Sequence, residues 1–218
     1  MPRITAPTLA EHVGLQRGRI LDAAGKLFLE KGYADTTLKT VAEEIGLRRN
    51  SLYRYFPDLN ALFLAWIERE YKHLQASGRA ILAHPGPAAR RIMAWFAHQT
   101  GRAAVEIEGQ VRMLQLASPQ TESLAALVAV EQSMSADALL AVVRRLPHVD
   151  DAAPYARGII KLTRAAGDAT DPHRDVAAAR AEVERMLDSA SRGAGPTVGK
   201  KSRGSQRRIS RTSLPARI

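Results

Sequence analysis

The sequence predicts an all-α fold. Apolar residues recur three and four positions apart through most of the chain, and Gly and Pro stand where these segments end. No stretch alternates apolar and polar residues as a strand would, and no repeat of fixed period is present. With 218 residues, of which 45% are hydrophobic, the chain can bury a core without covalent cross-links. It contains no cysteine, which excludes disulfides, thiol nucleophiles and cysteine-bound metal centres.

The first helix is expected between Leu15 and Lys31, behind a flexible arm formed by residues 1–14. Gly32 follows as a typical C-terminal stop. The apolar residues that share one face of this helix are Ile20, Ala24, Leu27 and Phe28.

Two short helices are expected next. The hydroxyl of Thr37 can cap the first of them, but Thr40 stands where a glutamate would complete a capping box, so we expect the box to be incomplete. Gly46 ends this helix because glycine readily adopts the left-handed conformation. The other helix is expected over residues 48–56 and ends at Pro57.

The rest of the chain reads as longer helices. Asp58 can cap a helix from Leu59 to about Ala83, which a Pro- and Gly-rich turn at residues 84–87 ends. Further helices are expected over residues 88–105, 108–117, 121–146, 151–167 and 173–190.

Charge is distributed unevenly along the chain. Of the net charge of +10, residues 1–60 contribute +2, residues 61–190 are neutral, and residues 191–218 hold eight Lys or Arg without any acid. Because Gly, Ser and Arg dominate the last stretch, we expect a basic disordered tail. It would either add a sequence-independent attraction for DNA phosphates or be a solvated segment without a role.

Residues 37–56 have the spacing of a helix-turn-helix. Ala42 is small enough for two helices to cross closely, and Gly46 permits the turn between them. Leu47 and Leu52 can then seat the second helix against the first. Any pair of antiparallel helices can show this spacing, so it is only moderately specific by itself.

One stretch of the sequence resembles a known family, namely GYADTTLKTVAEEIGLRRNSLYRYFPDLNALF. It is similar to the DNA-binding domain of the tetracycline-repressor (TetR) family of bacterial regulators. The resemblance extends from about Gln16 to Leu64 and is most specific from Ser51 to Phe56. It implies a three-helix DNA-binding domain over residues 15–58, an all-α ligand-binding domain over residues 59–190, and a homodimer. The expected function is that of a transcriptional regulator, a repressor released from its double-stranded DNA operator by a small molecule.

Two positions depart from the pattern of this family. Leu59 stands where the family often has a lysine that touches phosphate, and Asn50 stands where it often has glycine. The first change can weaken backbone anchoring, and the second can add a base contact. The operator of a relative therefore cannot be transferred to this chain.

The resemblance assigns DNA contacts to named residues. Base contacts in the major groove are expected from the start of the second helix of the motif, because Arg suits guanine and Asn suits adenine. These residues are Arg48, Arg49, Asn50 and Ser51. Phosphate contacts are expected from Arg17, Arg19, Thr37, Lys39, Tyr53, Arg54 and Tyr55. The alternative for each Arg is a solvated surface charge, and for Tyr53 it is core packing.

A ligand pocket is expected between the helices of the second domain, with aromatic, sulfur-containing and polar side chains around it. Plain core packing is the alternative for each of them. The candidates are Trp66, Met93, Trp95, Phe96, His98, Met113, Gln115 and Tyr155.

The dimer surface is expected on the last two helices, 151–167 and 173–190, whose many alanines permit close helix approach. An intramolecular helix pair is the alternative.

Other functional classes find little support. The six histidines form neither an HxxxH nor an HExxH pair, so no metal site is predicted, and no cofactor motif or acid–base constellation appears. No apolar run approaches the roughly 18 residues of a membrane span, and no signal peptide is evident, so we expect a cytoplasmic protein that does not bind membranes. Two alternatives stay open, a nucleoid-type DNA-binding protein and a helical enzyme.

Overall fold

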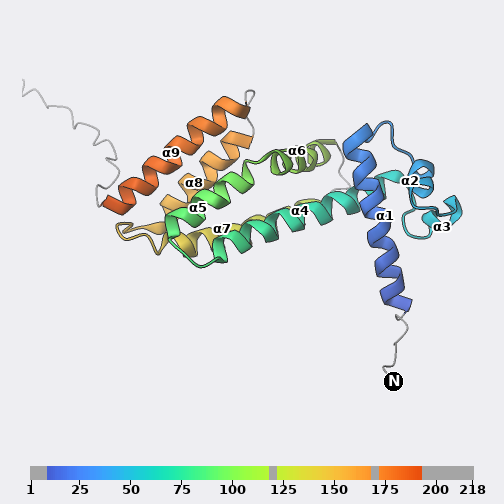
Figure 1. The fold of residues 1–218 in the computed structure, drawn as a ribbon, viewed down its shortest axis with the longest axis horizontal. Helices are drawn as coiled ribbons and strands as arrows, with labels where there is room; N and C mark the ends of the chain where they lie inside the picture. The colour runs from blue at the N-terminus through green and yellow to red at the C-terminus, as the bar shows by residue number, and fades with distance from the viewer. Residues whose placement is uncertain (1–8, 118–121, 168–171, 193–218) are drawn as a thin grey trace, which may run out of the picture.

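The computed structural model describes residues 9–117, 122–167 and 172–192, and this part of the chain is helical without any strand (Figure 1). Its helices are α1 (Leu9–Lys31), α2 (Leu38–Glu44), α3 (Arg49–Tyr53), α4 (Leu59–Ala83), α5 (Ala88–Gln99), α6 (Arg102–Ala117), α7 (Glu122–Val143), α8 (Ala152–Gly167) and α9 (Pro172–Arg192). The predicted fold class is confirmed.

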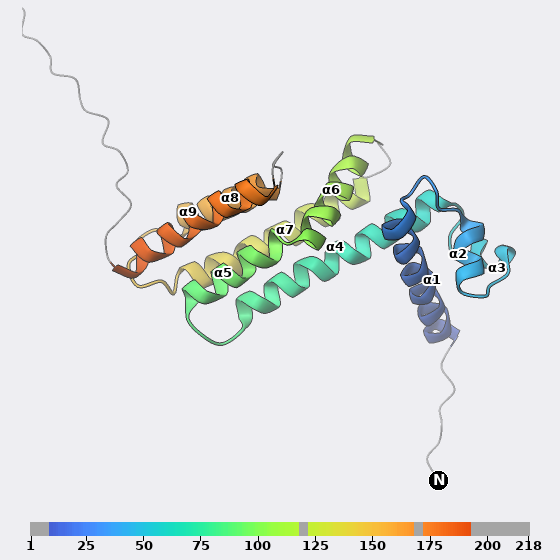
Figure 2. The same cartoon turned by 45° about the horizontal axis from the view of Figure 1, so that its top comes forward.

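The molecule is elongated, with α1, α2 and α3 grouped at one end (Figures 1 and 2). Helix α4 begins in this group and runs along the body, where it packs against α5, α6 and α7. Helices α8 and α9 pack against each other, and α8 also packs against α7. We call α1–α3 the head and α4–α9 the body.

Helix α1 begins at Leu9, six residues before the expected start. The prediction of a flexible arm is therefore wrong for residues 9–14. Glu11 lies in the first turn, where a negative charge favours the helix dipole, and the glycines at 14 and 18 are tolerated inside the helix. Residues 1–8 lie outside the described residues.

The capping box of α2 is complete, contrary to the expectation. The Thr37 hydroxyl accepts a hydrogen bond from the Thr40 backbone N–H at 3.1 Å, and the Thr40 hydroxyl accepts one from the Thr37 N–H at 3.0 Å. A threonine hydroxyl thus takes the place of the glutamate carboxylate. Helix α4 starts at Leu59 as expected, and Asp58 accepts from the Ala61 N–H at 2.7 Å.

A second boundary error of six residues concerns the segment predicted as one helix over residues 88–105. Helix α5 ends at Gln99, and α6 begins at Arg102. The Thr100 hydroxyl donates to the Phe96 carbonyl oxygen at 2.9 Å, and Gly101 follows it, so the chain turns without an apolar break in the pattern. Helix α3 is also shorter than expected.

Two hydrophobic clusters make up the core. The first contains residues of α1, α2, α3, α4, α6 and α7, so it joins the head to the near half of the body. The second joins the far ends of α4 and α7 to α5, α8 and α9. Residues on both sides of the predicted domain boundary after Asp58 thus pack in the same core cluster.

Helix α7 is apolar enough for a membrane span by length and composition, with a mean hydropathy of 1.5 in its best window. The expectation that no segment has this property is wrong for α7. Its composition has a physical reason in the fold, because α7 packs against α4, α5, α6 and α8. Its inward face carries Leu124, Val128, Ser135, Leu139, Val142 and Val143.

Candidate functional site

Helices α2 and α3 form the helix-turn-helix that the spacing predicts. Gly46 has a φ of 68°, the left-handed conformation required by the turn. The Leu47 N–H donates to the Ala42 carbonyl oxygen at 2.8 Å. Ala42 is 2% exposed and Leu52 is fully buried, so the two helices cross at a close contact.

The outward side of α3 and its flanks is polar. Arg48, Asn50 and Arg54 are exposed, and 40% of the surface of Tyr53 is accessible. Ser51 is half-buried. The side chain of Arg49 lies outside the described residues, although its backbone starts α3. The described side chains place hydrogen-bond donors and acceptors on the outward face of α3 and its flanks.

An open groove brings together three of the predicted phosphate contacts, Thr37, Lys39 and Tyr53. The ends of α2, α3 and α4 form its walls. Lys39 also pairs with Glu43 one turn later at 3.7 Å, and both side chains are mostly exposed. The groove is lined by Thr36, Thr37, Leu38, Lys39, Tyr53, Pro57, Asp58 and Leu59.

Arg17 and Arg19 make contacts within the head. The Arg17 guanidinium lies 4.2 Å from the centre of the Phe56 ring and donates to the Tyr55 carbonyl oxygen at 3.2 Å. It therefore ties α1 to the segment after α3. Arg19 donates to the Gln16 side chain at 3.5 Å. The Tyr55 side chain is half-buried against the first core cluster.

An exposed ion pair joins α1 to α2. Lys26 Nζ lies 2.7 Å from Glu44 Oε1. The hydrogen bond and the opposite charge raise the pKa of Lys26 and lower the pKa of Glu44. Since both groups are solvated, this pair orients the helices more than it stabilises them.

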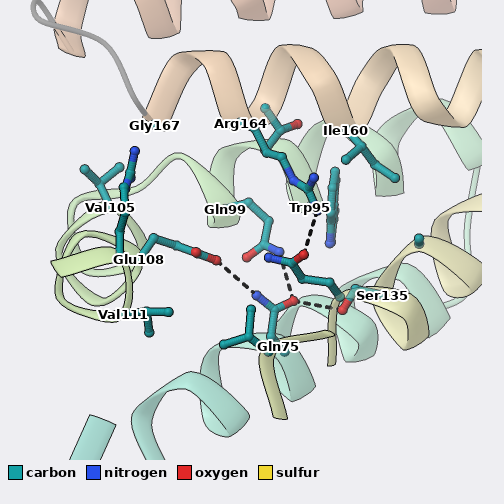
Figure 3. A pocket seen from close by; sticks show the side chains of 15 residues that line it. Gln75, Trp95, Gln99, Val105, Glu108, Val111, Ser135, Ile160, Arg164 and Gly167 are labelled. Carbon is teal, nitrogen blue, oxygen red and sulfur yellow. Dashed lines mark hydrogen bonds between the residues drawn. The ribbon is translucent and has the colours of Figure 1, made fainter. Parts of the chain in front are cut away.

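A cavity of about 300 Å³ lies inside the body, where α4, α5, α6, α7 and α8 meet (Figure 3). Its polar side chains surround Gln75. The Gln75 Nε2 donates to Glu108 at 3.5 Å, and its Oε1 accepts from Gln99 at 3.3 Å and from Ser135 at 2.8 Å. At the rim, Arg164 donates to the Gln132 oxygen at 2.9 Å.

The other lining residues are mostly aliphatic. The complete lining is Gln75, Trp95, Gln99, Val105, Glu108, Val111, Arg112, Val128, Gln132, Ser135, Ala136, Ile160, Thr163, Arg164 and Gly167. Tyr71 lies nearby on α4, one turn before Gln75, and is fully buried. Burial, together with the negative charge of Glu108, raises the pKa of Tyr71 above its ordinary value, so the hydroxyl stays neutral.

Among the predicted ligand residues, Trp95 lines this cavity. Four others make contacts elsewhere in the protein interior and do not line this cavity. Trp66 packs between Phe28 and Phe63 in the first cluster, and Met93 and Phe96 pack in the second. His98 Nε2 lies 3.1 Å from the Leu74 carbonyl oxygen, which ties α5 to α4.

Tyr155 also lies away from the cavity. Its hydroxyl donates to the Met186 carbonyl oxygen and joins α8 to α9, and burial raises its pKa to about 12. The side chains of Met113 and Gln115 lie outside the described residues. Aromatic and sulfur-containing residues are poor indicators of a ligand site, because large apolar side chains are buried wherever helices meet.

The sequence reasoning missed the polar lining of the cavity. One signal was present in α4, where Trp66, Ile67 and Tyr71 define the buried face and Gln75 continues it. A glutamine on an otherwise apolar stripe needs hydrogen-bond partners in the interior. The partners Glu108, Gln99 and Ser135 come from three other helices, and sequence spacing cannot show that they meet.

The comparisons with known proteins agree with this geometry. Residues 20–66 match the family model of the bacterial regulatory proteins, tetR family. An HTH-type transcriptional repressor of Mycobacterium tuberculosis, Rv1474c, is 30% identical over 76 residues, which cover 35% of this chain and 38% of the relative. The repressor KstR of Rhodococcus jostii is 34% identical over 64 residues, or 29% of this chain and 30% of the relative. The chain thus matches only 30% to 38% of the length of these relatives.

Solved structures match over a larger share of the chain. A TetR transcription regulator from Haloarcula marismortui has a TM-score of 0.64 and 17% identity, covering 81% of this chain and 98% of its own. A transcriptional regulator from Saccharomonospora viridis, crystallised with choline, has a TM-score of 0.63 and 18% identity, covering 80% and 96%. These structures share the fold, with a helical body behind the head. Residues 20–66 are thus similar to the bacterial regulatory proteins of the tetR family, and the described part of the chain shares the fold of these solved regulators.

Proposed function

We propose that the chain is a sequence-specific DNA-binding transcriptional regulator, namely a repressor that dissociates from its operator when it binds a small molecule. The observation that carries the proposal is the helix-turn-helix of α2 and α3, with the exposed polar face of α3 beside a groove that contains Thr37, Lys39 and Tyr53. Two relatives of the head are named repressors. The family is one of regulators, and the protein is expected to act in the cytoplasm, where its DNA is.

The packing of the body can couple ligand binding in the cavity to DNA binding by the head. Val111 of α6 lines the cavity and also belongs to the first core cluster, which contains the head. A ligand that shifts α6 or α4 therefore acts on the packing of the head. In a dimer, the two copies of α3 would need a separation of about 34–36 Å to meet successive turns of the major groove. A coupling of about 1–3 kcal/mol suffices to change operator affinity by roughly five- to 150-fold.

A pair of substitutions in the head tests the DNA-binding role. Asn50→Ala is expected to lower the affinity for a selected operator by about 1–3 kcal/mol and to leave the affinity for scrambled DNA nearly unchanged, because an amide can read a base edge. Lys39→Ala is expected to weaken binding to both DNAs and to reduce the slope of log affinity against log salt by about 1, because it removes a phosphate contact. Fluorescence anisotropy titrations at several salt concentrations measure both effects.

The controls separate the competing functions. Equal losses on operator and scrambled DNA for Asn50→Ala would contradict a base-reading role for this residue. If in vitro selection with the unmodified chain enriched no sequence at moderate salt, a nucleoid-type DNA-binding protein would be favoured instead. The predicted basic tail bears on that alternative, but residues 193–218 lie outside the described residues.

The proposed regulator is a homodimer that pairs through α8 and α9. Small residues lie exposed on the outward face of these helices, where a second copy can approach closely. They are Ala165, Ala177, Ala178 and Ala181. Helix α7 carries a competing surface, because Val130 and Met134 are 57% and 47% exposed.

Two matched alanine substitutions distinguish these surfaces. Ala181→Glu on α9 is expected to shift the full-length chain from dimer to monomer at micromolar concentration, because two buried carboxylates would face each other across a two-fold axis. Ala129→Glu on the exposed face of α7 serves as the control and is expected to leave the dimer intact. Light scattering measures both masses. A monomer for Ala129→Glu alone would place the interface on α7.

A further inference from the structure

The cavity in the body has a distinctive distribution of charge. Its lining holds two guanidinium groups, Arg112 and Arg164, and one carboxylate, Glu108. The Glu108 carboxylate already accepts a hydrogen bond from Gln75. The lining therefore carries a net positive charge, which favours an anionic ligand over a cationic one.

Arg164 is held in a position suited to binding a carboxylate. It lies in the last turn of α8, at the rim of the cavity, and its Nη2 donates to the Gln132 oxygen of α7 at 2.9 Å. Figure 3 shows the Arg164 side chain extending from α8 toward the other side chains that line the cavity. A guanidinium has five N–H donors in a planar fork, so this bond leaves donors for two parallel bonds to a carboxylate.

A second donor lies deeper. Trp95 is 4% exposed and lines the cavity, and its Nε1–H has no hydrogen-bond acceptor among the described residues. Buried indole N–H groups usually have an acceptor. A ligand oxygen, or a water that the ligand orders, would supply one.

The remaining walls and the volume limit the rest of the ligand. Val105, Val111, Val128 and Ile160 provide aliphatic contact surface. A volume of about 300 Å³ lies at the lower end of the range of small-molecule sites. It suits an unbranched chain or a small ring and is too small for a large multi-ring compound.

We infer that the effector of this protein is a small amphipathic carboxylic acid, with its carboxylate on Arg164 and its apolar part against the valines and Ile160. This inference rests on the proposed function, because it names the chemical class of the ligand for the same cavity. Binding of the acid to the cavity does not require DNA, so this inference and the proposed function can be tested separately.

The test uses three probes that share an eight-carbon chain and differ in the head group, namely octanoate, octanamide and octyltrimethylammonium. Calorimetric titration of the full-length chain without DNA at pH 7.5 is expected to give octanoate at least tenfold tighter binding than octanamide and no measurable binding of the cation. Arg164→Gln is expected to abolish the preference for octanoate over octanamide. Arg164→Lys, which keeps the charge without the fork, is expected to restore it in part.

Two further variants serve as comparisons. Arg157→Gln changes an exposed arginine on the same helix, outside the cavity lining, and is expected to bind octanoate like the unmodified chain. Trp95→Phe keeps a ring but removes the N–H, and it is expected to weaken both octanoate and octanamide by a similar factor. Melting temperatures show whether each variant is folded.

The outcomes separate this inference from the proposed function. Equal binding of octanoate and octanamide, tighter binding of the cation, or no octanoate binding at millimolar concentration would overturn the inference. An Arg164-dependent preference for octanoate that left operator affinity unchanged would support a carboxylic acid as the ligand class of the cavity and contradict ligand release. Selective operator binding together with a cavity that rejects acids would support the regulator and overturn the inference.

Discussion

Ile67→Ala is expected to lower the free energy of unfolding by about 2–5 kcal/mol, because it removes a fully buried side chain and leaves a cavity. Ile67 lies on α4 in the first core cluster, which holds the head and the near half of the body together. The loss should therefore appear in the whole chain rather than in the head alone. Urea denaturation followed by circular dichroism measures it.

Leu29→Ala is the matched control for this substitution. Leu29 is 57% exposed on α1, so its truncation is expected to change stability by no more than about 0.5 kcal/mol. A shared core also predicts that head and body unfold in one transition. Two separate transitions, with the head melting first in the unmodified chain, would show that the first cluster does not couple them.

Gly25→Ala is expected to destabilise the protein by about 1–3 kcal/mol through overpacking. A Cβ at Gly25 would overlap with Trp66 Nε1. The indole has little room to move, because its ring centre lies 5.3 Å from that of Phe28 and 5.8 Å from that of Phe63. Helix α1 must then shift away from α4, and operator affinity is expected to fall with stability.

The control for this change lies two turns earlier in the same helix. A Cβ added at Gly18 would have no atom within 4 Å. Gly18→Ala is therefore expected to stabilise the protein by up to about 1 kcal/mol, because alanine loses less backbone entropy than glycine when a helix forms. Thermal melts of both variants give the comparison. A Gly25→Ala variant as stable as Gly18→Ala would mean that α1 and α4 are not in close contact at this point.

The head could be predicted from the sequence because its structure depends on local chemistry. The left-handed turn at Gly46, the cap at Thr37 and the small Ala42 act within a few residues of the contacts they create. The start of α4 likewise depends on one capping carboxylate, Asp58. Where local reasoning failed, as in the break after Gln99, the apolar pattern continued through the turn and concealed it.

The cavity could not be predicted in this way. Its polar residues, Gln75, Glu108, Ser135 and Arg164, come from four helices and have no common spacing in the sequence. Apart from Trp95, which lines the cavity, the aromatic residues that the sequence suggested for a pocket pack in or against the two core clusters, because burial of apolar area governs where they lie.

By itself, the sequence determined the helical class and the helix-turn-helix, since helix periodicity, caps and turn glycines are local properties of the chain. The tertiary structure alone decided that head and body share one core, that Trp66 supports the head, and that Gln75 and Arg164 line one cavity. Those facts depend on how helices distant in the sequence pack against one another. That packing is determined by the free energy of burying complementary surfaces, which a local sequence pattern does not reveal.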